Sequence, residues 1–236
     1  MIVYGRNPVR EALRGRRAHA LERIWATRGA AGEQWLAGRD VAVVDSVEIE
    51  RLCGSDAHQG VCADAGPYPY VGAPELLSGP EPVLVALDEV QDPQNLGAIC
   101  RSAECAGATG VVITERRSVQ VTPAVCKASA GAVEHLPVAR VTNLSDFLVS
   151  AKQAECWCYG ASAGAARSYT EVDFGGGVVL VLGAEGRGLR PRVRESCDEL
   201  VSVPLRGRVQ SLNVGAAAAV LLYAILQGKL PLDRTP

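Results

Sequence analysis

The chain has 236 residues, of which 48% are hydrophobic and 21% are charged. This composition excludes a disordered chain and is sufficient for one large domain, or for a small domain and a medium one. The formal net charge of −2 is not typical of a nucleic-acid-binding protein, so the distribution of charge is more informative than its sum. No apolar run approaches the length of a membrane span, and no signal-peptide segment precedes Arg6. We therefore expect a cytoplasmic protein without a membrane partner.

The eight cysteines predict neither disulfides nor a metal site. They are scattered, mostly in apolar surroundings, and no C-x-x-C spacing occurs. Cys156 and Cys158 flank Trp157 in a strand-like alternation without a neighbouring histidine. Buried free thiols are the expected state. The three histidines share no motif with a nucleophile, so we predict neither a metal cofactor nor histidine catalysis.

The first 72 residues predict a small α/β domain, because short strand and helix patterns alternate along them. Strands are expected over residues 21–26, 41–44 and 61–63, and helices over residues 8–13, 32–36 and 47–52. Proline and glycine then interrupt the periodicity over residues 66–74 and 79–82. We interpret residues 73–82 as an interdomain linker.

Positive charge gathers in two parts of the chain, and either group could contact nucleic acid or form a solvated face. Residues 1–39 hold eight arginines and three acidic residues. The first group comprises Arg6, Arg10, Arg14, Arg16, Arg17, Arg23, Arg28 and Arg39, and the second comprises Arg187, Arg190, Arg192, Arg194, Arg206 and Arg208. The second group flanks the most polar segments of the chain, which favours a functional role for it.

From residue 83 onward the pattern becomes regular, and we assign residues 83–236 to a second domain. Residues 83–87 are continuously apolar, as in a strand covered on both faces. Further strands are expected over residues 110–113, 136–141, 156–160, 178–182 and 200–204, and helices over 95–107, 123–129, 144–153, 191–197 and 212–227. This alternation predicts an α/β fold in which helices cover both faces of a parallel sheet.

Three segments of this domain place polar side chains where an apolar strand gives way to a loop or helix. They are residues 92–103, 182–189 and 211–216. Sites of α/β proteins form at such strand ends. The side chains available for chemistry are those of Asn95, Arg101, Glu185, Ser211 and Asn213. The common nucleotide signatures G-x-G-x-x-G and G-x-x-x-x-G-K-[ST] do not occur at these positions.

In order, spacing and composition, these segments closely resemble the signature motifs of the SpoU (TrmH-type) branch of the SPOUT methyltransferases, which methylate ribose 2′-hydroxyls of RNA. Residues 88–103 resemble its first motif, residues 182–186 its second and residues 203–214 its third. Residues 3–13 resemble the start of the L30e-like substrate-binding domain that precedes many members. The pairing resembles the subgroup that methylates a guanosine of 23S rRNA.

The resemblance implies a C-terminal domain with a deep trefoil knot, a rare exception to the usual chain topology. It also implies S-adenosylmethionine as the methyl donor, RNA as the substrate and active sites at a homodimer interface. By motif matching, Gly183, Val203 and Leu212 should contact the donor, largely through backbone groups. Glycine allows close approach of the chain, whereas Val203 and Leu212 offer no polar side chain.

Arg101 matches the catalytic arginine of the family. An arginine is normally always protonated, so Arg101 could act as an unusual base, or it could hold a phosphate and stabilise developing alkoxide charge. Asn95 and Glu185 are expected to orient Arg101 or the ribose. Ser211 and Asn213 are expected to cap the last helix and to reach the substrate. The arginines expected to contact RNA are Arg6, Arg10 and Arg187.

Structural roles are the alternatives at these positions: a helix cap at Asn95 or Ser211, an exposed helix position at Arg101, and an ion pair with Arg187 or Arg190 at Glu185. Gly215 departs from the family, which usually has serine there. The alternative functions are ribose methylation of tRNA, a resistance-type methylation of an rRNA adenosine, and RNA binding without catalysis. A non-catalytic binder would have no need of all five polar side chains together.

Overall fold

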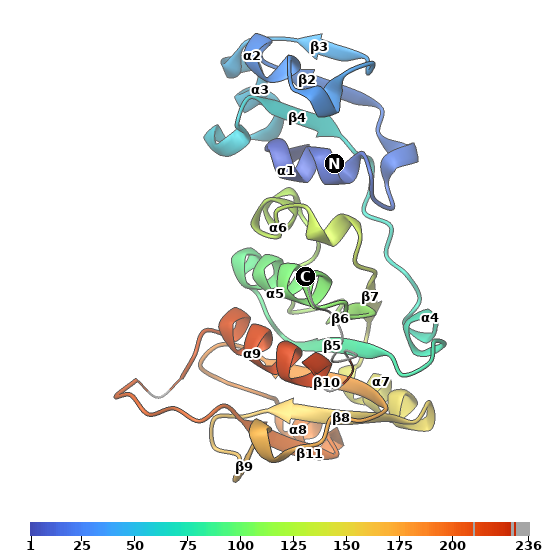
Figure 1. Ribbon diagram of the computed structural model, residues 1–236, viewed down its shortest axis with the longest axis vertical. Coiled ribbons are helices and arrows are strands. Elements are labelled where there is room, and N and C mark those ends of the chain that lie inside the picture. The colour runs from blue at the N-terminus through green and yellow to red at the C-terminus, as the bar shows by residue number, and fades with distance from the viewer. Residues whose placement is uncertain (210, 228, 230–236) are drawn as a thin grey trace.

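The computed structural model describes residues 1–209, 211–227 and 229, and Figure 1 shows two α/β units stacked along the long axis. The N-terminal unit contains a four-stranded sheet in the order β1-β4-β2-β3. Its strands are β1 (Ile2–Tyr4), β2 (Arg23–Ala26), β3 (Val41–Val43) and β4 (Val61–Asp64), and its helices are α1 (Arg6–Ala12), α2 (Arg28–Ala31) and α3 (Ser46–Cys53). The short 3₁₀ turns are η1 (Ala18–Ala20), η2 (Gln34–Leu36) and η3 (Asp56–His58).

Two details of this unit differ from the sequence prediction. The helix expected over residues 32–36 is only the 3₁₀ turn η2, preceded by the short helix α2. Strand β1 was not predicted, because three residues are too few for a periodic pattern. β1 is stabilised by antiparallel pairing with β4, which lies about 60 residues later in the sequence.

The C-terminal unit contains a seven-stranded sheet in the order β7-β6-β5-β10-β8-β11-β9, and all of its pairings are parallel. The strands are β5 (Val83–Asp88), β6 (Gly110–Thr114), β7 (Val138–Val141), β8 (Cys156–Ala161), β9 (Arg167–Ser168), β10 (Gly177–Gly183) and β11 (Glu199–Ser202). The helices are α4 (Ala73–Leu77), α5 (Pro93–Cys105), α6 (Pro123–Ala128), α7 (Leu144–Gln153), α8 (Pro191–Ser196) and α9 (Val214–Gln227), with 3₁₀ turns η4 (Ala132–Glu134) and η5 (Tyr169–Glu171). The predicted parallel α/β sheet is confirmed. Residues 210, 228 and 230–236 of the predicted second domain lie outside the described residues.

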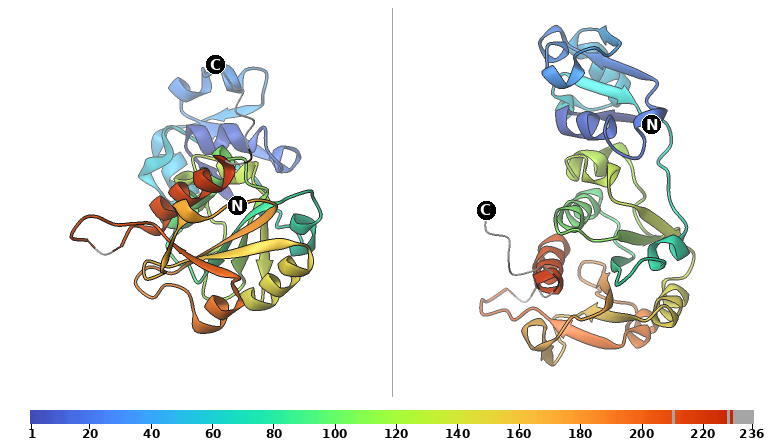
Figure 2. Two further views of the ribbon diagram at one scale, coloured as in Figure 1. Left: turned by 60° about the horizontal axis from the view of Figure 1, so that its bottom comes forward. Right: turned by 45° about the vertical axis from the view of Figure 1, so that its right-hand side comes forward.

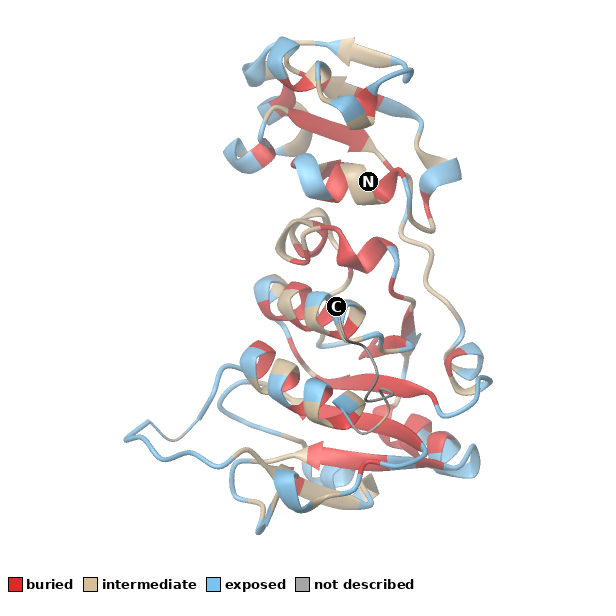
Figure 3. Ribbon diagram, in the orientation of Figure 1, coloured by how far each residue is buried: buried red, intermediate tan, exposed pale blue. Residues whose placement is uncertain are grey.

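Helices lie on both faces of the sheet, and much of the ribbon between them is coloured as buried (Figures 2 and 3). Alternate residues of β5 face the two helical layers. Val83, Val85 and Leu87 of β5 pack in a cluster with α5, α6 and α9. Leu84 and Ala86 pack in a second cluster with α4, α7 and α8. Residues of β5 and β10 are buried on both faces, which explains their continuously apolar sequences. Within the described residues, no helix has the length and apolar character required to cross a membrane.

Side-chain caps define where several helices begin. Asp92 accepts a hydrogen bond from Gln94 N, so α5 begins at Pro93, two residues before the predicted start. Asn213 accepts hydrogen bonds from Gly215 N and Ala216 N, so α9 begins at 214 rather than at 212. All eight cysteines are free, as expected; five are buried, Cys53 and Cys197 are partly buried, and Cys105 is exposed.

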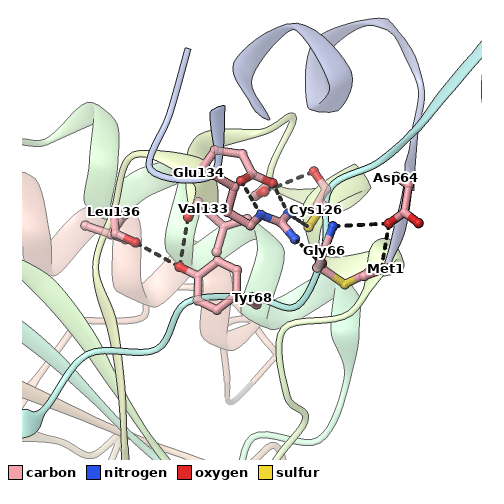
Figure 4. Close-up of polar contacts among 10 residues, drawn as sticks. Met1, Asp64, Gly66, Tyr68, Cys126, Val133, Glu134 and Leu136 are labelled. Atoms are coloured by element: carbon pink, nitrogen blue, oxygen red, sulfur yellow. Dashed lines mark hydrogen bonds and ion pairs between the residues drawn. The ribbon is translucent and has the colours of Figure 1, made fainter. Parts of the chain in front are cut away.

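A buried polar cluster joins the two units (Figure 4). The side chains of Arg17 and Glu134 are 1% and 0% exposed, and Arg17 Nε donates to Glu134 Oε2 at 2.8 Å. Burial alone lowers the pKa of Arg17, but the hydrogen bonds and charge of Glu134 outweigh it and raise that pKa. Arg16 N also donates to Glu134 O at 2.9 Å, and Tyr68 donates to Val133 O at 2.9 Å. These contacts fix the N-terminal unit against η4.

The segment that connects the units lies along the C-terminal unit rather than free in solvent. Tyr70 Oη accepts a hydrogen bond from Val121 N at 2.8 Å, and the Arg140 guanidinium lies 4.2 Å from the Tyr70 ring centre. Val71 forms a parallel bridge with Ala139. Within the segment predicted as a linker, residues 73–77 form α4, whose Leu76 packs in the core.

Candidate active site

The polar segments meet at the carboxyl ends of β5, β10 and β11, the usual place for sites in parallel sheets. A cavity of about 680 Å³ opens there. Its apolar wall includes Leu182, Val201 and Leu221, and its polar wall includes Glu185 and Arg187. The residues predicted to contact the methyl donor all line this cavity, namely Gly183, Val203 and Leu212. Ser211 and Asn213 line it as well.

Asn213 connects all three predicted motifs. Its Oδ1 accepts from Gly215 N at 2.9 Å, which orients the amide group. Its Nδ2 therefore points the other way and donates to Asn95 Oδ1 at 2.8 Å and to Glu185 Oε1 at 2.7 Å. Asn213, which caps α9, thus positions the carboxamide of Asn95 on α5 and the carboxylate of Glu185 in the loop after β10.

The same network determines the amide orientation of Asn95, because hydrogen-bond partners distinguish the oxygen of an amide from its nitrogen. Because Asn213 can only donate at this contact, Asn95 must present Oδ1 to it. The Nδ2 group of Asn95 is left with no hydrogen-bond partner in the described part of the chain. Asn95 is 5% exposed, so the site holds a nearly buried side chain whose donor group is free to bind a ligand.

A carboxylate that the sequence analysis did not single out holds the loop after β10. Asp88, 1% exposed at the end of β5, accepts hydrogen bonds from Arg190 N at 2.8 Å and Arg190 Nε at 2.7 Å. The loop of residues 183–190 is therefore tied to β5 at its far end. The available signal was an acidic residue directly after the apolar run of residues 83–87.

The packing of its own loop requires glycine at position 183, whether or not a ligand is bound. A Cβ at this position would overlap the carbonyl group of Gly188 and would lie 2.5 Å from Leu189 N. Ala184 and Gly188 also form an antiparallel bridge, so the loop folds back directly over Gly183. We predicted that glycine at this position lets the donor approach the chain closely. In the structure, residues 188–189 approach Gly183 closely.

We expect Gly183→Ala to weaken binding of S-adenosylmethionine at least about 10-fold, because the loop must move away from the new methyl group. Calorimetric titration of the purified protein measures this affinity. Gly175→Ala is the matched control, since a Cβ there would lie 3.9 Å from its nearest neighbour, Asp173 Oδ1. Equal affinities for the two variants would contradict the proposed packing constraint.

A second cavity of about 310 Å³ lies beside the first. Its walls are residues 89–92 and Asn95 on one side, and Ala184, Glu185 and Arg187 on the other. Ala184, Glu185 and Arg187 line both cavities. Ligands in the two cavities would therefore meet at Glu185, as the donor and acceptor of a transferred group must.

The predicted arginines lie in different surroundings. Arg187 lines both cavities. Arg101 is exposed on α5, and it lines neither cavity and makes no hydrogen bond or ion pair with the described residues of its own chain. Arg6 lies 3.1 Å from Glu33 and Arg10 lies 2.9 Å from Glu11, both in the N-terminal unit. A single chain therefore assembles Asn95, Glu185, Ser211 and Asn213 but does not bring Arg101 to them.

The fold and this site define a parallel α/β protein with a small-molecule cavity at its strand ends, and the comparisons with known proteins give the family and its activity as an RNA methyltransferase. Residues 82–223 match the SpoU rRNA methylase family, and residues 2–71 match the substrate-binding domain of RNA 2′-O ribose methyltransferases. The chain belongs to the SpoU rRNA methylase family.

Relatives and solved structures agree with this assignment. The chain is 37% identical to a Bacillus subtilis protein named for the TrmH family of tRNA/rRNA methyltransferases, over 97% of this chain and 96% of that protein. It is 38% identical to an uncharacterised tRNA/rRNA methyltransferase of Synechocystis over 96% of this chain, but spans only 62% of that longer protein. The crystal structure of an AdoMet-bound rRNA methyltransferase from Sinorhizobium meliloti superposes with a TM-score of 0.79 at 26% identity, covering 98% of this chain and 88% of that one.

Proposed function

We propose that this protein transfers a methyl group from S-adenosylmethionine to a ribose 2′-hydroxyl of RNA, on a guanosine of 23S rRNA. The observation that carries the proposal is the hydrogen-bonded set of Asn95, Glu185 and Asn213 between two adjoining cavities. One cavity suits a small-molecule donor and the other suits an acceptor nucleotide. Family membership and the AdoMet-bound relative from Sinorhizobium meliloti support the donor and the reaction.

The larger cavity fits S-adenosylmethionine chemically. Its volume of about 680 Å³ lies within the usual range for small-ligand sites. Leu182, Val201 and Leu221 offer an apolar wall for the adenine ring, and backbone groups near Gly183, Val203 and Leu212 offer hydrogen bonds. When bound, the donor supplies an electrophilic methyl group on a sulfonium, so the protein has mainly to align it with the hydroxyl.

The N-terminal unit supports an RNA substrate. It matches a substrate-binding domain and carries all eight arginines of the first group, including Arg6 and Arg10. We propose that it has the L30e-like role and binds rRNA through phosphate contacts and shape. Because its junction with the C-terminal unit is buried, it would present RNA at a fixed distance from the cavities. These events belong in the cytoplasm, where ribosomal RNA is made.

The C-terminal segment supports a homodimer. Large apolar side chains are exposed along the loop before α9 and along α9 itself, namely Leu205, Val209, Leu212, Val220 and Tyr223. Exposed apolar side chains on one segment favour an interaction site, and a second copy can cover them symmetrically. The described part of the loop projects away from the sheet (Figures 1 and 2). α9 then packs on α5 and β10, and we propose that this C-terminal segment forms the trefoil knot that the family resemblance implies.

We propose that Arg101 acts in the active site of the partner subunit. Its side chain is exposed on α5, the helix that packs against α9, and the described residues of its own chain give it no partner. In a symmetric dimer it would lie at the shared surface and reach the partner's site. There its guanidinium would hold a phosphate and stabilise the developing alkoxide, while Asn95 and Glu185 orient the ribose.

We expect Arg101→Ala to reduce kcat for methyl transfer about 10²- to 10³-fold, with unchanged affinity for S-adenosylmethionine. Mixing Arg101→Ala with Glu185→Ala subunits tests whether Arg101 acts across the interface. If it does, each heterodimer regains one intact site, and random mixing restores about a quarter of wild-type activity. If it acts within its own chain, no mixed site is intact. Near-wild-type transfer by Arg101→Ala would refute its role.

The target is tested by mapping 2′-O-methyl groups in rRNA and tRNA from cells with and without the gene. Loss of one methylguanosine in 23S rRNA is the expected result. Loss of a modification in tRNA instead would favour the second candidate function, ribose methylation of tRNA. The names of the relatives refer to both tRNA and rRNA.

A further inference from the structure

The smaller cavity has an unusual charge for a protein that binds RNA. Three carboxylates line it, those of Glu89, Asp92 and Glu185, against the single guanidinium of Arg187. Asp92 and Glu185 have no ion-pair partner among the described residues, so their part of the wall repels phosphate groups. At about 310 Å³, the cavity is at the small end of ligand sites. Its occupant should therefore be one small, uncharged group that presents N–H donors.

Two further observations mark this cavity as a binding site rather than a cluster of acidic residues. Asn95 is 5% exposed and lines the cavity, yet its Nδ2 group has no partner within residues 1–209, 211–227 and 229. Glu89 has a φ of 59°, a left-handed conformation that a residue with a side chain rarely adopts. An unused donor on a nearly buried side chain and a strained backbone on one wall are typical of a functional site.

Of the three carboxylates, Asp92 is the one that no other side chain among the described residues contacts through a hydrogen bond or an ion pair. Glu89 Oε1 lies 3.1 Å from Arg190 and 3.6 Å from Arg117, so arginines already neutralise that side chain. Glu185 Oε1 accepts from Asn213. Asp92 Oδ1 accepts one hydrogen bond, from Gln94 N at 2.9 Å. Its Oδ2 accepts none from the described residues.

We propose that the target base enters this cavity and that Asp92 recognises the donor edge of guanine. Guanine carries two neighbouring donors on its Watson–Crick edge, N1–H and the 2-amino group, which match the two oxygens of a carboxylate. Adenine and cytosine place an acceptor beside the amino group, and uracil has one N–H between two carbonyls. Each of these bases would turn a lone pair toward Asp92, so the carboxylate both selects guanine and rejects the others.

This inference rests on the proposed function and adds the residue that determines its base specificity. It also gives the neighbouring groups separate tasks. Asp92 would hold the base, the free Nδ2 of Asn95 would donate to a ribose oxygen, and Arg187 would contact a phosphate outside the acidic wall. The 2′-hydroxyl would then lie near Glu185, where the two cavities meet.

The test uses Asp92→Asn in the full-length protein. Asparagine caps helices as well as aspartate, so α5 should remain intact. The substrates are transcripts of the mapped target RNA with guanosine, inosine or adenosine at the target position. Inosine lacks only the 2-amino group. Asp45→Asn is the matched control, because Asp45 caps α3 in the N-terminal unit, where it accepts from Glu48 N at 2.8 Å.

For the wild type and for Asp45→Asn, we expect kcat/KM to fall about 10- to 100-fold from guanosine to inosine, and further for adenosine. For Asp92→Asn, activity on guanosine should fall and the guanosine-to-inosine ratio should collapse to within about threefold, with an unchanged melting temperature. A ratio that stays at the wild-type value would overturn the role of Asp92 while leaving the methyltransferase proposal intact. A mapped target other than guanosine would overturn it too, and absence of methyl transfer to any RNA would overturn both proposals.

Discussion

Glu134→Ala is expected to lower the free energy of unfolding by about 3–5 kcal/mol, the largest stability effect that we predict for a single substitution. The side chains of Glu134 and Arg17 are 0% and 1% exposed, so removing the carboxylate leaves a guanidinium buried without its counterion. The substitution also leaves a cavity beside Tyr68, whose hydroxyl is bonded to the neighbouring Val133 carbonyl. Urea denaturation followed by circular dichroism measures the change.

The double variant Arg17→Met with Glu134→Leu separates charge burial from packing. Because apolar side chains of similar size remove both buried charges, we expect it to recover most of the lost stability. A double variant as unstable as Glu134→Ala would show that the pair contributes through its specific hydrogen bonds instead. The affinity for RNA should follow the same order, since the pair fixes the N-terminal unit against η4.

Asn213→Ala is expected to reduce methyl transfer about 10²- to 10³-fold, the largest catalytic effect apart from that of Arg101. The substitution removes the donor shared by Asn95 and Glu185, so both side chains lose their fixed orientation. It also removes the cap of α9, which should cost about 1 kcal/mol of stability. Single-turnover methylation assays and thermal denaturation measure the two effects separately.

Asn213→Asp is the informative companion variant. An aspartate accepts from Gly215 N as well as asparagine does, so the cap and the melting temperature should be retained. It cannot donate to Asn95, and it places a second negative charge beside Glu185. Activity should therefore remain as low as in Asn213→Ala. Wild-type activity of Asn213→Asp would mean that the donated hydrogen bonds are dispensable.

Much of the fold could be predicted from local patterns. The apolar runs of β5 and β10 indicate strands covered on both faces, because every residue of such a strand meets a hydrophobic layer. Helices α5, α6, α7 and α9 lie within about two residues of their predicted positions. Short elements were less predictable: β1 has three residues, and only its pairing with β4 makes it a strand.

The sequence by itself determined which strand ends carry polar side chains, and through their order it indicated the family. Only the tertiary structure decided which partners those side chains have. Asn213 and Asn95 are 118 residues apart, Arg190 and Asp88 are 102 apart, and Arg17 and Glu134 are 117 apart. Periodicity predicts the face on which a side chain lies, because that depends on neighbours three or four residues away. Partners so distant meet only when the sheet order is fixed, and the same order places Arg101 outside the site of its own chain.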